Sequence, residues 1–388
     1  MNIKALEQKY VAPTYGRFDL VVDHGSGALI YDENGKKYID MSSGIGVNAF
    51  GVDDSIWKDA VINQLGKIQH ISNLYYTEPM AKLAELLCEK TGMKKVFFGN
   101  SGAEANECLI KAARKYSSDK YGKDRSTIIT LTNSFHGRTM ATLSATGQES
   151  MHCHFGPFLP DFVHVPANDL PAMLDAMSQT GVCAVILEMI QGEGGVIPLD
   201  KDYVQAIADA AAKSDILLLV DEVQTGNGRT GALFAYEHFG IKPDAFSTAK
   251  GLGGGLPIGA CVLGSKLEST LSAGTHGSTF GGNPVCAAGA VSILERLDDV
   301  LLESVRCKGE LVRSMLEEAQ GVTGIFGMGL MIGIGVGEKS AKDIAVKCLD
   351  KGVIVLTAHE NVRLLPPLNI ETEQLIEAVN ILKGVIAE

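Results

Sequence analysis

The chain has 388 residues, of which 46% are hydrophobic and 21% charged, and its formal net charge is −12. This length predicts two or three domains, and the composition is typical of an α/β protein. The negative charge, without any block of lysines and arginines, argues against nucleic acid as a partner. No run of about 18 apolar residues occurs, so we expect no membrane-spanning segment.

The cysteines and the start of the chain indicate a cytoplasmic protein. The eight cysteines are scattered without CxxC spacing, which is typical of free thiols in a reducing compartment. The first ten residues, MNIKALEQKY, lack the apolar stretch of a signal peptide.

Short apolar runs separated by turn residues open the chain. The runs at 20–22, 28–31 and 37–40, with Asn34-Gly35 between the last two, predict an antiparallel meander. Beyond residue 56, helical patterns alternate with short β-rich runs, which predicts βα units on a mainly parallel sheet. We expect helices at 56–65, 79–90 and 103–116, and strands at 95–98, 127–131, 184–187, 217–220, 245–247 and 260–263.

The last hundred residues return to a mixed pattern. A helix is predicted at 285–297, after Asn283-Pro284, and strands are predicted at 330–336 and 352–356. We therefore expect a large central domain, residues 46–284, and a smaller α+β domain formed by both chain ends, residues 1–45 and 285–388.

A helix start follows the first predicted strand of the large domain. Ser101 and Glu104 have capping-box spacing, and Gly102 permits close approach of a ligand to the backbone. The free N–H groups of Gly102 and Ala103 would lie at the positive end of the helix, where a phosphate binds. The alternative is a plain helix cap without a ligand.

Asp221 directly follows the apolar run Ile216–Val220. Ligands of open α/β sheets lie beyond the carboxyl ends of strands, so this carboxylate is a candidate site residue rather than only a turn cap. Nearby, Val223 and Gln224 would contact an aromatic ligand at this site. Val223 would press on one face of its ring, and Gln224 would reach a phenolic oxygen on the ring.

Lys250 lies between a β-rich run and four glycines among residues 251–255. A solvated surface lysine is the ordinary alternative, but this context favours a lysine that meets a ligand. A lysine and an aspartate so placed suit pyridoxal phosphate, with Lys250 bearing the aldehyde as a Schiff base and Asp221 holding the pyridine nitrogen protonated.

Two arginines are candidates for binding substrate carboxylates, with a surface ion pair as the alternative for each. Arg138 lies in FHGRT and Arg363 in VRLLPP. Glu193, in a glycine-rich turn, would neutralise one arginine when the substrate lacks a second carboxylate.

Two other patterns do not fit the chemistry they suggest. Residues 226–231 match GxGxxG, but the preceding Asp221 and Glu222 would repel a pyrophosphate, which argues against a nicotinamide-dependent oxidoreductase. His152-Cys153-His154 has no second pair of ligands, so we expect no metal.

Together these segments resemble the class III (subgroup II) aminotransferases, which are fold type I pyridoxal phosphate enzymes. The resemblance covers the whole chain and rests on SGAEANE at 101–107, FHGRT at 135–139, QGEGG at 191–195, DEVQTG at 221–226, GRTG at 228–231, AKGLGG at 249–254 and HGSTFGGNP at 276–284. One departure is Glu188-Met189-Ile190, where Glu-Pro followed by a hydrophobic residue is commoner.

The resemblance implies a role for each matching residue. Lys250 would carry the cofactor and Asp221 would pair with its ring nitrogen, while the turn at Ser101, Gly102 and Ala103 would bind its phosphate. Phe135 would stack on the ring opposite Val223. Arg138 and Ser278 would contact substrate, and Thr279 would reach the cofactor phosphate of a neighbouring subunit in a homodimer.

Within the class, the chain is most similar to members that act on acetylornithine. The implied reaction moves the δ-amino group of N2-acetyl-L-ornithine to 2-oxoglutarate. Succinylornithine, ornithine, 4-aminobutyrate and N-succinyl-diaminopimelate remain open as donors. A non-catalytic pyridoxal-phosphate-binding regulator is disfavoured, because a lysine–aspartate pair accompanies two carboxylate-binding arginines.

Overall fold

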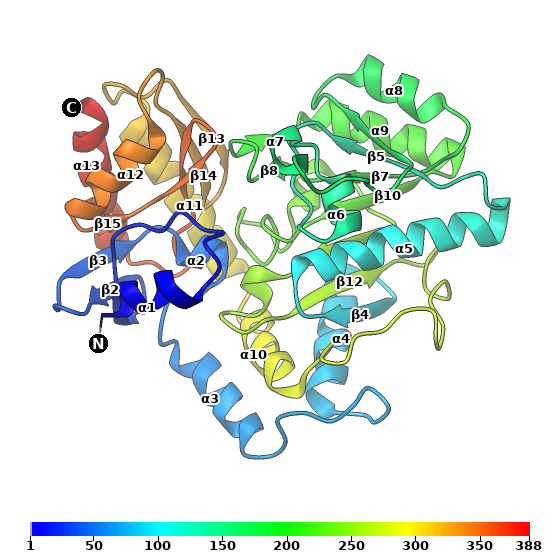
Figure 1. Ribbon diagram of the computed structural model, residues 1–388, viewed down its shortest axis with the longest axis horizontal. Helices are drawn as coiled ribbons and strands as arrows, with labels where there is room; N and C mark the ends of the chain where they lie inside the picture. Colours follow the sequence, from blue (N-terminus) through cyan, green and yellow to red (C-terminus); the bar gives the residue numbers. More distant parts are fainter. Residues whose placement is uncertain (1) are drawn as a thin grey trace.

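The computed structural model describes residues 2–388 and contains one large sheet and two four-stranded sheets (Figure 1). A fourth sheet has only two strands, β8 (Ile190–Gln191) and β9 (Ile197–Pro198). The large sheet has seven strands in the order β4-β12-β11-β10-β7-β5-β6. Only β12 runs in the direction opposite to the other six strands, which confirms the predicted mainly parallel sheet.

The strands of the large sheet lie close to the predicted ranges, with β6 as an additional edge strand. They are β4 (Lys95–Gly99), β5 (Thr127–Leu131), β6 (Phe162–Val165), β7 (Val182–Leu187), β10 (Leu217–Asp221), β11 (Ala245–Thr248) and β12 (Gly259–Leu263). The helices between and beside them are α3 (Ser55–Leu65), α4 (Glu78–Thr91), α5 (Gly102–Tyr121), α6 (Met140–Ala145), α7 (Glu149–His152), α8 (Leu170–Ser178), α9 (Lys201–Ser214) and α10 (Pro284–Leu294).

The large sheet is buried on both faces, and its strands divide their side chains between two cores. In β10, Leu217 and Leu219 join a cluster with α5, whereas Leu218 and Val220 join a second cluster that includes α9. Successive strand residues point to opposite faces, so a continuous run of aliphatic residues is what a sheet covered on both sides requires.

The two small sheets are formed by the chain ends. One contains β1 (Val22–Ser26), β2 (Leu29–Asp32), β3 (Lys37–Asp40) and β15 (Val353–Ile354); the other contains β13 (Gly324–Met328), β14 (Met331–Gly335), β17 (Asn361–Leu364) and β16 (Leu356–Ala358). Helices α11 (Asp299–Leu316), α12 (Ala341–Asp350) and α13 (Thr372–Ala387) pack in this region, whereas α1 (Ile3–Tyr10) has no buried residue and α2 (Ser43–Gly46) is a short turn. Among residues 2–388, no helix is both long and apolar enough to cross a bilayer.

Two expectations for the small sheets were wrong in detail. The first strand of the meander is Val22–Ser26 rather than 20–22, because Gly27 adopts a φ of 58° and lets Ser26 pair with Leu29 across a two-residue turn. The expected strand at 352–356 is two strands on different sheets. Val353 and Ile354 pair with β3, whereas Leu356 to Ala358 pair with β17.

A buried arginine joins distant parts of the chain. Arg229 is 3% exposed and donates from Nη1 to the carbonyl oxygens of Leu330 and Pro366. Burial lowers the pKa of Arg229 to about 9, and the negative charge of Asp40 opposes that shift. Asp40 is itself buried at the end of β3, so each charge compensates the other in the interior.

Arg229→Met should lower the free energy of unfolding by about 3 kcal/mol, because it leaves Asp40 buried without its compensating charge. Urea denaturation would measure the change. Arg17→Met is the control, since Arg17 pairs with Glu7 at the surface, and should cost less than about 1 kcal/mol. Equal stability of the two variants would contradict a structural role for Arg229.

Candidate active site

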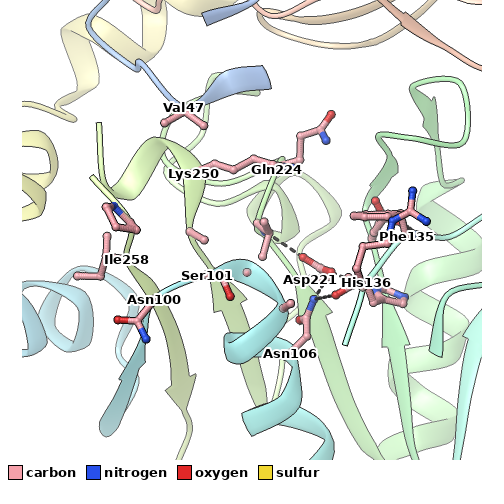
Figure 2. Close-up of a pocket in the computed structure, with 18 of the residues that line it drawn as sticks. Val47, Asn100, Ser101, Asn106, Phe135, His136, Asp221, Gln224, Lys250 and Ile258 are labelled. Carbon is pink, nitrogen blue, oxygen red and sulfur yellow. Dashed lines mark hydrogen bonds and ion pairs between the residues drawn. The ribbon is translucent and has the colours of Figure 1, made fainter. Parts of the chain in front are cut away.

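A cavity of about 490 Å³ opens at the carboxyl edge of the large sheet (Figure 2). The loops that follow β4, β5, β7, β10 and β11 all contribute to its wall, because parallel strands end at the same edge. Its lining includes Ser101, Gly102, Ala103, Phe135, Arg138, Asp221, Val223, Gln224 and Lys250. Nine residues singled out in the sequence therefore meet in one pocket.

Asp221 is 4% exposed, and its carboxylate is held by two side chains that the sequence did not single out. Asn106 donates from Nδ2 to Oδ2 of Asp221 over 2.7 Å, and Nδ1 of His136 lies 2.8 Å from the same oxygen. The other oxygen accepts the N–H of Val223. Figure 2 shows Asn106 and His136 on either side of Asp221.

The charge of Asp221 governs the protonation of His136. Burial disfavours the imidazolium, but the hydrogen bond and the negative charge of Asp221 outweigh burial and raise the pKa of His136. Nε2 of His136 and Oδ1 of Asn106 are buried without a partner among the described residues. His136 lies in the motif FHGRT, directly after the candidate Phe135, and this position was the one sequence feature that could have indicated its role.

The predicted cap at Ser101 is present at the start of α5. Ser101 caps α5 by accepting the N–H of Glu104 over 3.2 Å. Glu104 reaches back to the N–H of Asn100 rather than to that of Ser101. A Cβ on Gly102 would lie 2.6 Å from Cγ1 of Val223, and one on Gly259 would lie 2.1 Å from the carbonyl oxygen of Ser101. Both glycines are therefore needed for close packing around this turn.

Lys250 follows β11 with a φ of 44°, a left-handed conformation that is uncommon for a residue with a side chain. Such strain is typical of functional sites. Burial lowers the pKa of Lys250, although Glu193 opposes that shift with its negative charge. A lowered pKa favours the neutral amine that reacts with an aldehyde.

Arg363, on β17, is buried and forms an ion pair with Glu193, which is partly exposed. Nη1 of Arg363 lies 2.6 Å from Oε1 of Glu193, and it also donates to Oε1 of Gln224 over 3.0 Å. Nε2 of Gln224 donates to Glu193 in turn. Burial would raise the pKa of Glu193, but Arg363 reverses the effect and lowers it. The two candidate residues therefore contact each other, with Gln224 between this pair and the pocket.

The remaining candidates lie at the edge of the pocket or outside it. Arg138 is exposed, and its guanidinium carbon lies 5.6 Å from the ring centroid of Phe135. Ser278 and Thr279 line a neighbouring cavity of about 880 Å³. Asn100 connects the two spaces, because it lines the first and donates to Oγ of Ser278 over 3.1 Å.

The patterns set aside in the sequence have structural explanations. A Cβ on Gly226 would meet Phe234 at 2.8 Å, and one on Gly231 would meet Arg306 at 2.4 Å, so these glycines allow close packing against protein side chains. Between residues 2 and 388, no group of three or more His, Cys, Asp or Glu side chains could hold a metal ion. His152 instead contacts the carbonyl oxygen of Leu143.

The chain belongs to the class-III aminotransferase family, whose pattern matches residues 10–386. It is 52% identical to the acetylornithine aminotransferase of Haemophilus ducreyi, with 100% of this chain and 99% of that one covered.

Solved structures show the same fold. An ornithine aminotransferase from Toxoplasma gondii, with partial occupancy of PLP at its active site, matches with a TM-score of 0.94 and 30% identity, covering 99% of this chain and 93% of that one. The N-acetylornithine aminotransferase of Stenotrophomonas maltophilia matches with a TM-score of 0.86 and 34% identity, covering 99% and 98%. The predicted fold type I architecture is thus confirmed.

Gly102→Ala should raise the dissociation constant of the cofactor about tenfold, because the added methyl group displaces Val223 or the start of α5. Equilibrium titration of the cofactor-free protein would measure this. Gly384→Ala in α13 is the control, since nothing lies within 4 Å of an added Cβ there. Unchanged cofactor affinity in the Gly102 variant would show that the turn tolerates a side chain.

Proposed function

We propose that this chain moves the δ-amino group of N2-acetyl-L-ornithine to 2-oxoglutarate, with pyridoxal phosphate as cofactor, in arginine biosynthesis. The observation that carries the proposal is the pocket at the sheet edge, which combines Lys250 with the buried Asp221. The similarity to the acetylornithine aminotransferase of Haemophilus ducreyi, at 52% identity, supports the choice of acetylornithine.

The residues of the pocket fit this cofactor. The turn of Ser101, Gly102 and Ala103 would hold the phosphate at the start of α5. Phe135 and Val223 would cover the ring, Gln224 would meet the phenolic oxygen and Lys250 would join the aldehyde carbon. When bound, the group supplies an electron sink for the bond that breaks at the amine-bearing carbon.

The protein side chains would perform the remaining tasks. Asp221, oriented by Asn106 and His136, would keep the proton on the ring nitrogen. Lys250, whose pKa burial lowers, would move a proton at the substrate carbon that bears the amine. Arg138 would bind the substrate carboxylate at the rim of the pocket.

Glu193 and Arg363 would distinguish the two substrates. In the ion pair, Glu193 neutralises Arg363, which suits an ω-amino donor that brings no carboxylate to this position. A dicarboxylate would replace Glu193 as the partner of Arg363, because a buried guanidinium requires an anion.

We also propose a cytoplasmic homodimer with shared active sites. Leu74, which lines the same cavity as Ser278 and Thr279, is exposed. Tyr75, Tyr76 and Phe280, which lie close to lining residues in the sequence, are exposed too, as expected of a surface that a second copy covers. In such a dimer, Thr279 would reach the cofactor phosphate of the partner.

Trapping of the lysine tests the cofactor chemistry. Borohydride reduction of the holoenzyme, followed by peptide mapping, should label Lys250 and abolish the activity. A label on another residue would refute the role of Lys250.

The choice of donor is tested by spectral titration with acetylornithine, succinylornithine, ornithine, 4-aminobutyrate and N-succinyl-diaminopimelate. The half-reaction should be fastest with acetylornithine, and a faster reaction with another donor would reassign the substrate.

Glu193→Gln should raise the KM for acetylornithine about tenfold and leave the KM for 2-oxoglutarate unchanged or lower, because Arg363 loses its neutralising partner only in the donor complex. Separate measurement of the two half-reactions would show the split. Equal changes for both substrates would refute the proposed switch.

A further inference from the structure

Glu188 is a buried carboxylate that follows β7 and lines the pocket, yet the reaction described above gives it no task. Its Oε1 accepts the N–H of Phe135 over 2.8 Å, and its Oε2 accepts the N–H of Gly192 over 3.2 Å. One side chain thus binds the backbone of two loops that are far apart in sequence.

The two loops carry different parts of the site. Phe135 belongs to the loop that would cover the cofactor ring. Gly192 precedes Glu193, and its carbonyl oxygen accepts a hydrogen bond from Arg363 over 3.1 Å. A Cβ on Gly192 would lie 2.5 Å from Oε1 of Gln224, so this backbone also supports the amide between pocket and ion pair.

We propose that Glu188 is a positioning residue, which fixes the ring-covering loop at Phe135 relative to the Glu193–Arg363 pair. It thereby sets the distance between the ring pocket and the carboxylate-binding group, and this preorganisation favours the binding of both substrates. This inference rests on the proposed function.

An ionised carboxylate suits this task because it accepts hydrogen bonds at both oxygens. A glutamine accepts at one oxygen only, and its amide NH2 would face an N–H donor at the other position. The charged and titratable groups that act on Glu188 are His136, Asp221 and Lys250, and burial raises the pKa of Glu188 to about 7.

Glu188→Gln is the variant to make, and Glu222→Gln is its matched control. Glu222 is also fully buried at the edge of the sheet, and burial raises its pKa to about 7. However, Glu222 binds the N–H of Tyr236 and the hydroxyl of Thr225, outside the pocket. Both variants bury a neutral amide in place of a carboxylate, but only one affects the loops.

Hydrogen exchange on the cofactor-free protein measures directly how firmly the backbone of the two loops is held. In Glu188→Gln, peptides that cover 133–138 and 189–195 should exchange at least about tenfold faster, whereas Glu222→Gln should leave them unchanged.

In the holoenzyme, Glu188→Gln should raise the KM of both substrates about tenfold, with kcat within about threefold of the parent. If Glu188→Gln does not fold, Glu188→Asp, which is too short to reach both N–H groups, carries the same expectation.

Unchanged exchange in both peptides, or the same acceleration in the Glu222 control, would overturn the positioning role. A fall in kcat with both KM values unchanged would also overturn it. Failure of the proposed function is distinguishable, since the parent enzyme itself would then show no half-reaction.

Discussion

The buried carboxylate of Asp221 is the charge around which the pocket is organised. A carboxylate at this depth requires hydrogen-bond donors and a positive partner. Asn106 and the backbone N–H of Val223 are the hydrogen-bond donors. His136, whose pKa is raised, is the positive partner when it is protonated. The positions of α5, the loop after β5 and the turn after β10 are thereby fixed relative to one another, which gives the pocket its shape.

A second group of charged side chains, centred on the buried Arg363, acts in the same way at the other side of the pocket. Glu193 lies on a loop that follows a strand of the large sheet, whereas Arg363 lies on β17 of a small sheet. Gln224 joins the two residues to the wall of the pocket. Glu188 stands between the two systems, close enough to His136 and Asp221 for their charges to affect it. The site is thus a chain of polar contacts, so the effect of one substitution depends on its neighbours.

The sequence predicted the elements that depend on local pattern. The central strands were predictable because aliphatic runs such as 217–220 must be buried on both faces, and Asp221 and Lys250 were predictable because they follow such runs. The cap at Ser101 was predictable from its spacing to Glu104. The family resemblance, rather than pattern alone, indicated the roles of Phe135, Ser278 and Thr279.

Contacts between distant residues could not be predicted. Asn106 and Asp221 are 115 positions apart, and the local sequence around neither residue predicts their contact. Glu188 binds Phe135, 53 positions earlier, through a backbone group that has no sequence signature. The break at Val355 between two sheets was missed for the same reason, because strand partners rather than composition decide it.

The reversed direction of β12 has a consequence for biosynthesis of the chain. In the large sheet, β4 is an edge strand that pairs with β12 alone, and Gly259 of β12 packs directly on the carbonyl of Ser101. The turn at Ser101 therefore gains its support from residues that leave the ribosome about 160 positions later. A nascent chain that ends before β12 therefore lacks the strand that pairs with β4 and the glycine that packs against Ser101.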